Sequence, residues 1–208
     1  IRQLKTEEII GQFHQLKKIH PSLGHIVFMG MGEPLLNLKA VLPSLNTFTS
    51  ESMFNLSKRH ITVSTSGYLA GLKTLLKENI ILNLAFSVGH ANPLKRKEVM
   101  PCEEKNPILE CARILKEYQT THNRKLTLEY TLLKGFNEDD ASLMHLSNLA
   151  KYLNAKVNLI NLNPHPKIPH QPISIPRLKV CQNFLKKEGL RATISYTKGQ
   201  DIVAACGQ

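Results

Sequence analysis

Tryptophan is absent from the 208-residue sequence, and aromatic residues make up only 6% of it. This scarcity disfavours a nucleic-acid surface that relies mainly on stacking bases against aromatic rings. No apolar run approaches the roughly 18 residues that a membrane-spanning helix requires. The start, IRQLKTEEIIGQFHQLKK, is charged and amphipathic and lacks the pattern of a secretory signal peptide. We therefore expect a cytoplasmic protein that does not enter a membrane.

Closely spaced cysteine pairs are also missing. The four cysteines are Cys102, Cys111, Cys181 and Cys206, and none forms a C-x-x-C pair, which excludes a zinc ribbon or a thioredoxin-type motif. Cys111 and Cys181 lie among apolar residues in helix-like stretches and are expected to be buried packing residues. Cys206, in AACGQ, has small neighbours that would leave its thiol uncovered. It is either a reactive group or a cysteine at a frayed terminus.

Acidic residues are few relative to basic ones. The 27 lysines and arginines against 16 aspartates and glutamates give a net charge of +11. Such a balance favours an anionic partner, most commonly RNA or DNA, because binding releases counterions from the phosphates. Basic residues cluster at 57–60 and 94–97, which supports this interpretation. The alternative is a solvated basic surface without a partner.

The chain alternates between helix-like and strand-like segments along its whole length. Amphipathic stretches near 5–19 and 38–49 are each followed by a short apolar run, and the pattern continues to a sixth strand near 191–197. This alternation predicts an α/β fold with a parallel sheet and a single domain over residues 1–208. Polar or glycine-containing motifs follow nearly every strand, which favours a barrel whose site lies at the carboxyl ends of the strands.

The strongest of these motifs is GMGEP at 30–34. Gly30 and Gly32 would let a ligand approach the backbone, and Pro34 would fix the turn that carries Glu33. A rigid carboxylate beside exposed backbone suits the binding of an amino group. A strand-ending turn with a surface glutamate is the alternative.

Other polar residues are weaker signals when taken alone. STSG at 64–67 and the amide of Asn163 could hold a ligand but are also ordinary turn residues. The histidines show no metal-ligand spacing. Asp139 and Asp140 are expected to cap a helix.

Taken in order, six segments resemble the radical-SAM rRNA adenine-C2 methyltransferases, the RlmN/Cfr family: GMGEPLLN, SKRHITVSTSG, FSV, LEYTLLKGFNEDD, VNLINLNPHP and DIVAACGQ. The resemblance is collinear over the whole chain, and GEPLLN and STSG follow the RlmN pattern. It implies the partial (β/α) barrel of radical-SAM enzymes. It also implies that an N-terminal RNA-binding region and the iron–sulfur loop lie outside these 208 residues.

In that family, one S-adenosylmethionine (SAM) methylates a cysteine, and a second SAM is cleaved at a [4Fe-4S] cluster to start radical transfer of carbon to adenine. The resemblance implies 23S rRNA as substrate, with tRNA as a further candidate. It also implies an electron donor such as flavodoxin and a monomeric enzyme.

The resemblance assigns SAM contacts to five residues that match family motifs: Gly32, Glu33, Ser64, Ser87 and Asn163. Cys206 matches the cysteine that carries the methyl group. The family's SAM-contacting histidine falls on Gly89, with His90 one residue later. Either His90 substitutes for that histidine or the contact is lost.

The cluster motif C-x-x-x-C-x-x-C is absent from the chain. We expect its cysteines upstream of Ile1, and we expect the segment alone to be inactive. A non-catalytic RNA-binding barrel that has lost the cluster is the main alternative. A phosphate-binding metabolic barrel is a third reading, but it leaves AACGQ unexplained.

Overall fold

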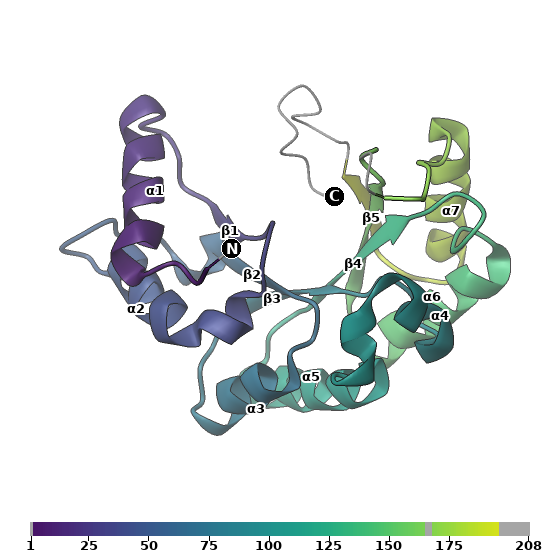
Figure 1. The fold of residues 1–208 in the computed structure, drawn as a ribbon, viewed down its shortest axis with the longest axis horizontal. Helices are drawn as coiled ribbons and strands as arrows, with labels where there is room; N and C mark the ends of the chain where they lie inside the picture. The colour runs from purple at the N-terminus through teal and green to yellow at the C-terminus, as the bar shows by residue number, and fades with distance from the viewer. Residues whose placement is uncertain (1, 165–167, 196–208) are drawn as a thin grey trace.

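A computed structural model describes residues 2–164 and 168–195. Six parallel strands form one sheet whose spatial order follows the chain order, from β1 to β6. Their bounds are Ile26–Phe28 (β1), Ile61–Thr65 (β2), Asn83–Ser87 (β3), Thr127–Leu132 (β4), Lys156–Asn161 (β5) and Ala192–Ser195 (β6). The sheet curves strongly, and Figure 1 shows its concave side facing upward. The predicted α/β fold with six strands is confirmed.

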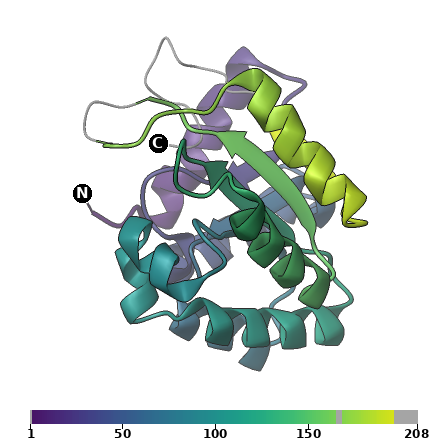
Figure 2. The same ribbon diagram turned by 90° about the vertical axis from the view of Figure 1, so that its right-hand side faces the viewer.

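Helices cover the convex side of this curved sheet (Figure 1). The longer ones are α1 (Thr6–Ile19), α2 (Leu38–Thr49), α3 (Leu69–Lys77), α5 (Ile108–His122), α6 (Asp140–Tyr152) and α7 (Ile175–Lys187). Figure 2 shows α5, α6 and α7 along the outside of the β4–β5 region. The short helix α4 (Pro93–Val99) and the 3-10 turns η1 (Pro34–Asn37), η2 (Lys58–His60) and η3 (Pro101–Glu104) complete the described elements.

The apolar core lies between the sheet and the helices. In β4, Leu128, Tyr130 and Leu132 are fully buried in the main core cluster, while the alternating residues Thr127 and Glu129 are only partly covered. Because successive strand residues point to opposite faces, the second set faces the concave side. The same alternation in the other strands gives the concave face a polar lining that includes Ser64, Ser87, Asn158 and Thr193.

Local sequence signals explain where several helices begin. Asp139 is the N-cap of α6, and its carboxylate accepts a hydrogen bond from the Ser142 backbone N–H at 2.9 Å, so its predicted capping role is confirmed. Ser174 caps α7 in the same way through the Arg177 N–H. Asn92 caps α4, with Pro93 at the first helical position. Across the described residues, no helix is long and apolar enough to cross a membrane.

Candidate functional site

Glu33 lies just beyond β1 and is held in place by two other segments. It is the N-cap of η1, and its Oε1 accepts a hydrogen bond from the Leu35 N–H at 3.1 Å. Its Oε2 accepts two bonds from Ser66, one from the backbone N–H and one from the hydroxyl, both 2.7 Å long. These contacts fix the carboxylate at the carboxyl ends of β1 and β2, where parallel α/β folds bind ligands.

Ser66 is itself fixed by a buried cation. The Ser66 carbonyl accepts a hydrogen bond at 2.6 Å from Arg96, whose side chain is fully buried. Arg96 also donates to the Val88 carbonyl and pairs with the Glu103 carboxylate. A buried charge is tolerated when it is paired and hydrogen-bonded in this way. Arg96 therefore ties the ends of β2 and β3 together and supports the residue that holds Glu33.

The roles of Ser66 and Arg96 were not predicted from the sequence. From the sequence, STSG is a possible ligand-binding loop, but no role is assigned to Ser66. Residues 94–97 are interpreted only as a cluster of basic residues. In the structure, Arg96 is an internal support, although Lys95 and Lys97 beside it are exposed. The signal that could have identified Ser66 is weak, because its partner Glu33 lies 33 positions earlier in the chain.

Ser64 and Ser87 meet on the concave face. Their hydroxyl oxygens are 3.5 Å apart, at the outer limit of a hydrogen bond. Both lie near the carboxyl ends of neighbouring strands, β2 and β3. The structure thus brings together two serines that the resemblance assigns to one site. They lie next to the ends of β1 and β2, after which Glu33 and Ser66 follow.

Gly32 and Asn163 lie at the same edge of the sheet. Gly32 has a φ of +97°, and a Cβ built there would meet no heavy atom within 4 Å, so the backbone is open to a ligand. Asn163 follows β5 and its side chain is buried. The loop after β5 returns to the strand through Asn161, whose amide bonds both the N–H and the carbonyl of Ile173 at 3.0 Å.

His90 is also at this edge, but its ring faces away from the two serines. Its Nδ1 accepts a hydrogen bond from the Asn92 N–H at 2.9 Å, so its Nε2 donates to the Ser142 hydroxyl at 3.1 Å. The ring is buried, and burial lowers the pKa of His90. Nδ1 therefore stabilises the β3–α4 loop itself, and Nε2 joins this loop to α6.

The structure explains why position 89 is glycine. A Cβ at Gly89 would collide with the side-chain sulfur of Met100. The Gly89 carbonyl accepts a hydrogen bond from the buried side chain of Asn137 at 3.1 Å, which fixes the loop from the other side. A histidine at position 89 would not fit into this packing.

Two of the described cysteines, Cys111 and Cys181, are packing residues, whereas Cys102 is only partly buried. Cys111 and Cys181 are fully buried, as predicted. Burial raises the pKa of Cys111 to about 12, so its thiol stays protonated at neutral pH. Within residues 2–164 and 168–195, no three histidine, cysteine or acidic side chains form a group that could hold a metal ion. Cys206 lies outside the described residues.

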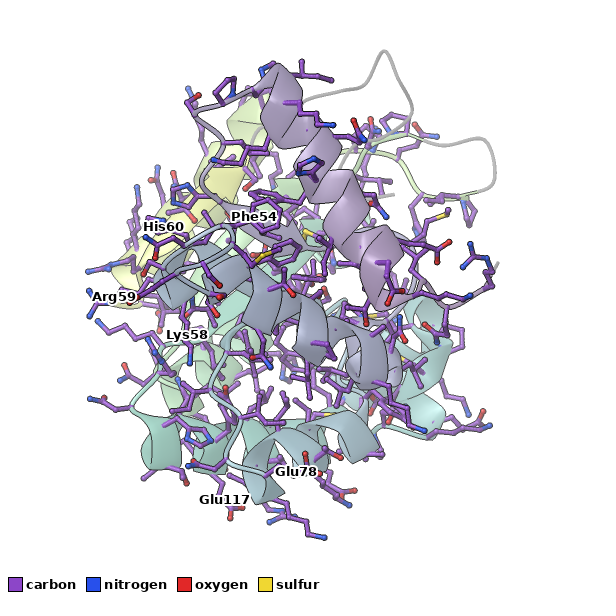
Figure 3. The ribbon with its side chains drawn as sticks, turned by 90° about the vertical axis from the view of Figure 1, so that its left-hand side faces the viewer. Phe54, Lys58, Arg59, His60, Glu78 and Glu117 are labelled. Carbon is purple, nitrogen blue, oxygen red and sulfur yellow. The ribbon has the colours of Figure 1, made fainter. Side chains whose placement is uncertain are left out.

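The basic segment at 57–60 lies at the opposite end of β2 from the candidate site. Lys58, Arg59 and His60 form η2, which comes just before β2, whereas Ser64 and Ser66 come at the other end of β2. Figure 3 shows the three side chains together at one side of the molecule. His60 stacks on His25, with ring centroids 4.2 Å apart.

Comparisons with known proteins identify the family of the chain. The model of the Radical SAM superfamily matches residues 1–146. The chain is 36% identical to a probable dual-specificity RNA methyltransferase RlmN from Treponema denticola, and 38% identical to a dual-specificity RNA methyltransferase RlmN from Alkalilimnicola ehrlichii. All of the chain is covered in both comparisons, but it spans only 60% and 59% of the two relatives. The resemblance to RlmN proteins expected from the motifs is confirmed.

Solved structures give the same result. A radical SAM methyltransferase from Sphaerobacter thermophilus superposes with a TM-score of 0.92 at 34% identity, and covers 100% of this chain and 62% of the other. A domain of a pyruvate-formate lyase-activating enzyme from Bacteroides vulgatus shares the fold, with a TM-score of 0.62 over 84% of this chain. The chain therefore belongs to the Radical SAM superfamily.

Proposed function

We propose that this chain forms the SAM-binding barrel of a dual-specificity RNA methyltransferase that methylates carbon 2 of adenine in 23S rRNA. Transfer RNA is a further candidate substrate. The observation that carries the proposal is the Glu33 carboxylate, fixed by Ser66 next to the paired hydroxyls of Ser64 and Ser87. The names of the similar RNA methyltransferases support the same conclusion.

The residues at this edge fit the groups that SAM presents. The Glu33 carboxylate would accept hydrogen bonds from the amino group of SAM, and the open backbone at Gly32 would let the ligand approach. The hydroxyls of Ser64 and Ser87 and the amide of Asn163 supply further donors and acceptors. His90 would support the adjoining loop, because both of its ring nitrogens are already bonded. When bound, SAM supplies the methyl group and, with an iron–sulfur cluster, the radical chemistry.

The described cysteines do not fit a [4Fe-4S] cluster. Cys111 and Cys181 are buried in the core, and no metal-binding group of three residues exists among the described residues. The proposal therefore places the cluster ligands outside this chain. Cys206 is proposed as the methyl carrier on the strength of its motif alone.

The net charge of +11 supports an RNA substrate, because phosphates attract a basic protein. We further propose a monomeric cytoplasmic enzyme that receives electrons from a donor such as flavodoxin. These finer points rest on the resemblance to the family.

The methyl carrier can be tested by peptide mass spectrometry. The protein encoded by the whole reading frame would be reconstituted anaerobically with iron, sulfide and SAM, and the peptide containing Cys206 would then be analysed. We expect one added methyl group on Cys206. Cys111→Ala should leave this modification in place, whereas Glu33→Gln should reduce it. An unmethylated Cys206 in protein that still binds RNA would favour the non-catalytic alternative.

A further inference from the structure

Exposed cations lie at the amino ends of four of the six strands, at the edge of the sheet opposite the candidate site. Lys58 and Arg59 belong to η2, which comes directly before β2. Lys125 comes two residues before β4, Lys156 is the first residue of β5, and Arg191 directly precedes β6. These five residues are called the amino-end edge below.

Strand pairing brings three of these cations side by side. The Lys156 N–H donates to the carbonyl of the residue after Lys125 at 3.2 Å, and the Val157 N–H donates to the Arg191 carbonyl at 2.9 Å. Neighbouring strands lie about 4.8 Å apart, so the three backbones lie within about 10 Å. The residue that follows each cation is buried in the core, so strand alternation directs the three side chains toward the concave side.

The turn that carries the other two cations is held in one conformation. The Ser57 hydroxyl accepts a hydrogen bond from the Arg59 N–H at 3.3 Å. From the neighbouring strand β3, the Asn83 amide donates to the Lys58 carbonyl at 2.9 Å and to the Ile61 carbonyl at 3.0 Å. Lys58 and Arg59 are therefore presented from a fixed backbone, and Figure 3 shows their side chains together.

The cations of the amino-end edge differ from those on the helices in lacking acidic partners. Five helical cations each form a salt bridge with a glutamate: Lys73–Glu110, Lys95–Glu98, Lys97–Glu104, Lys151–Glu188 and Arg177–Glu138. Within residues 2–164 and 168–195, no salt bridge joins a cation of the amino-end edge to an acidic side chain. Lys156 acts on Glu129 only at longer range. The positive charge at this edge is therefore available to an anion.

Acidic side chains mark where this basic surface ends. Glu78, at the end of α3, and Glu117, on α5, are exposed and lie beyond Lys58 in Figure 3. The positive surface thus follows the strand ends and does not continue onto these helices.

We propose that the amino-end edge binds the phosphate backbone of the substrate RNA at a distance from the target adenine. The inference rests on the proposed function, which makes RNA the polyanion. Unpaired lysines and arginines bind phosphates because counterions are released. A strand of five or six residues is about 17–20 Å long, so the RNA must extend at least that far beyond an adenine at the carboxyl ends. Phosphate contacts orient an RNA without reading its sequence.

The salt dependence of RNA binding tests this surface. The protein from the whole reading frame would be titrated by fluorescence anisotropy with a labelled fragment of 23S rRNA at several KCl concentrations. Lys156→Gln with Arg191→Gln should reduce the slope of log affinity against log salt by about two, about one for each phosphate contact. Lys58→Gln with Arg59→Gln should do the same, and it provides a second variant on an exposed turn if the first pair folds poorly.

The matched control is Lys73→Gln with Lys116→Gln, which removes the same charge from α3 and α5. Lys73 pairs with Glu110, and the Lys116 amino group lies 5.8 Å from the centre of the Tyr152 ring. This control should leave the slope almost unchanged. All three double variants should bind S-adenosylhomocysteine as tightly as the unmodified protein, because the candidate SAM site lies at the other end of the strands.

The contrary outcomes are distinct. If the control lowers the slope as much as the edge variants, or if no variant changes it, the inference is wrong and the proposed function stands. If the edge variants keep the slope for RNA but lose affinity for flavodoxin titrated in the same way, the edge binds a protein and the RNA assignment is wrong. If the unmodified protein does not bind RNA, the proposed function and this inference fail together.

Discussion

Ser66 is the residue on which the geometry of Glu33 depends most directly. It contributes two hydrogen bonds to the carboxylate, and only the hydroxyl bond is lost when the side chain is removed. The backbone bond remains, so the carboxylate should become looser without being released. Ser66 therefore acts by positioning Glu33 rather than by contacting the reacting atoms.

Ser66→Ala is expected to weaken the binding of S-adenosylhomocysteine about tenfold, or about 1.4 kcal/mol. Isothermal titration calorimetry of the chain measures this change directly. Ser52→Ala is the matched control, because Ser52 is exposed and its hydroxyl bonds only Ser50. Equal affinities for the Ser66 variant and the unmodified chain would show that Glu33 does not need this support.

For Glu129, substitution is expected to raise the stability of the fold at neutral pH. Because its pKa is raised in the folded protein, its contribution to the free energy of unfolding is present below the ordinary pKa of glutamate and is lost as pH rises through the raised value. Glu129→Gln cannot ionise, so it should have a higher melting temperature than the unmodified chain at neutral pH. The difference should shrink toward about pH 4, where the glutamate becomes protonated. A variant that is less stable at neutral pH would show that burying this carboxylate carries no such cost.

At the scale of elements, the order of strands and helices could be predicted well from the sequence. Periodicity and turn residues predict every strand and the six longer helices, since each of these helices has an apolar stripe and each strand a short apolar run: α1, α2, α3, α5, α6 and α7. Helix α4 was not expected from the sequence, because it has only seven residues, begins with a proline and is mostly charged. Its burial of Arg96 is a tertiary effect that no local pattern shows.

The candidate site was predictable only where a motif marked it. Glu33, Ser64 and Ser87 could be named from the sequence, since each belongs to a recognisable segment. The amino-end edge could not, because Lys156 and Arg191 become neighbours only through the pairing of β5 with β6. One signal was present: each of these two cations begins or directly precedes a strand.

The β2–α3 turn provides a test of how the elements fit together. Gly67 has a φ of +98°, and a Cβ there would lie 2.8 Å from the Cys111 sulfur and 2.9 Å from the Phe86 ring. Gly67→Ala should therefore lower the free energy of unfolding by about 2–4 kcal/mol, through backbone strain and overpacking. Urea denaturation measures the change.

Gly11 supplies the contrast within the same chain. It lies inside α1, and a Cβ there would meet nothing within 4 Å. Gly11→Ala should raise the free energy of unfolding by about 0.5–1 kcal/mol, because alanine restricts the unfolded chain and favours the helix. A similar loss of stability in both alanine variants would show that the packing around Gly67 is not as tight as described.

At the scale of the whole molecule, the apolar core and the polar candidate site lie on opposite faces of the sheet. The convex face and its helices supply the apolar core, while the concave face and the carboxyl ends of the strands carry the polar groups. Glu33, Ser64, Ser87 and Asn163 all lie on this second surface, although they come from four different strands or the loops that follow them. This division explains how a stable scaffold can present a polar site without weakening its core.

The measurement that tests this account most directly is nucleoside mass spectrometry of RNA. The protein from the whole reading frame, reconstituted anaerobically with SAM and a reductant, would be incubated with unmodified 23S rRNA. The account predicts 2-methyladenosine in the digested RNA, and a loss of this product in Glu33→Gln and Cys206→Ala. RNA without 2-methyladenosine, after treatment with reconstituted protein that cleaves SAM, would contradict it.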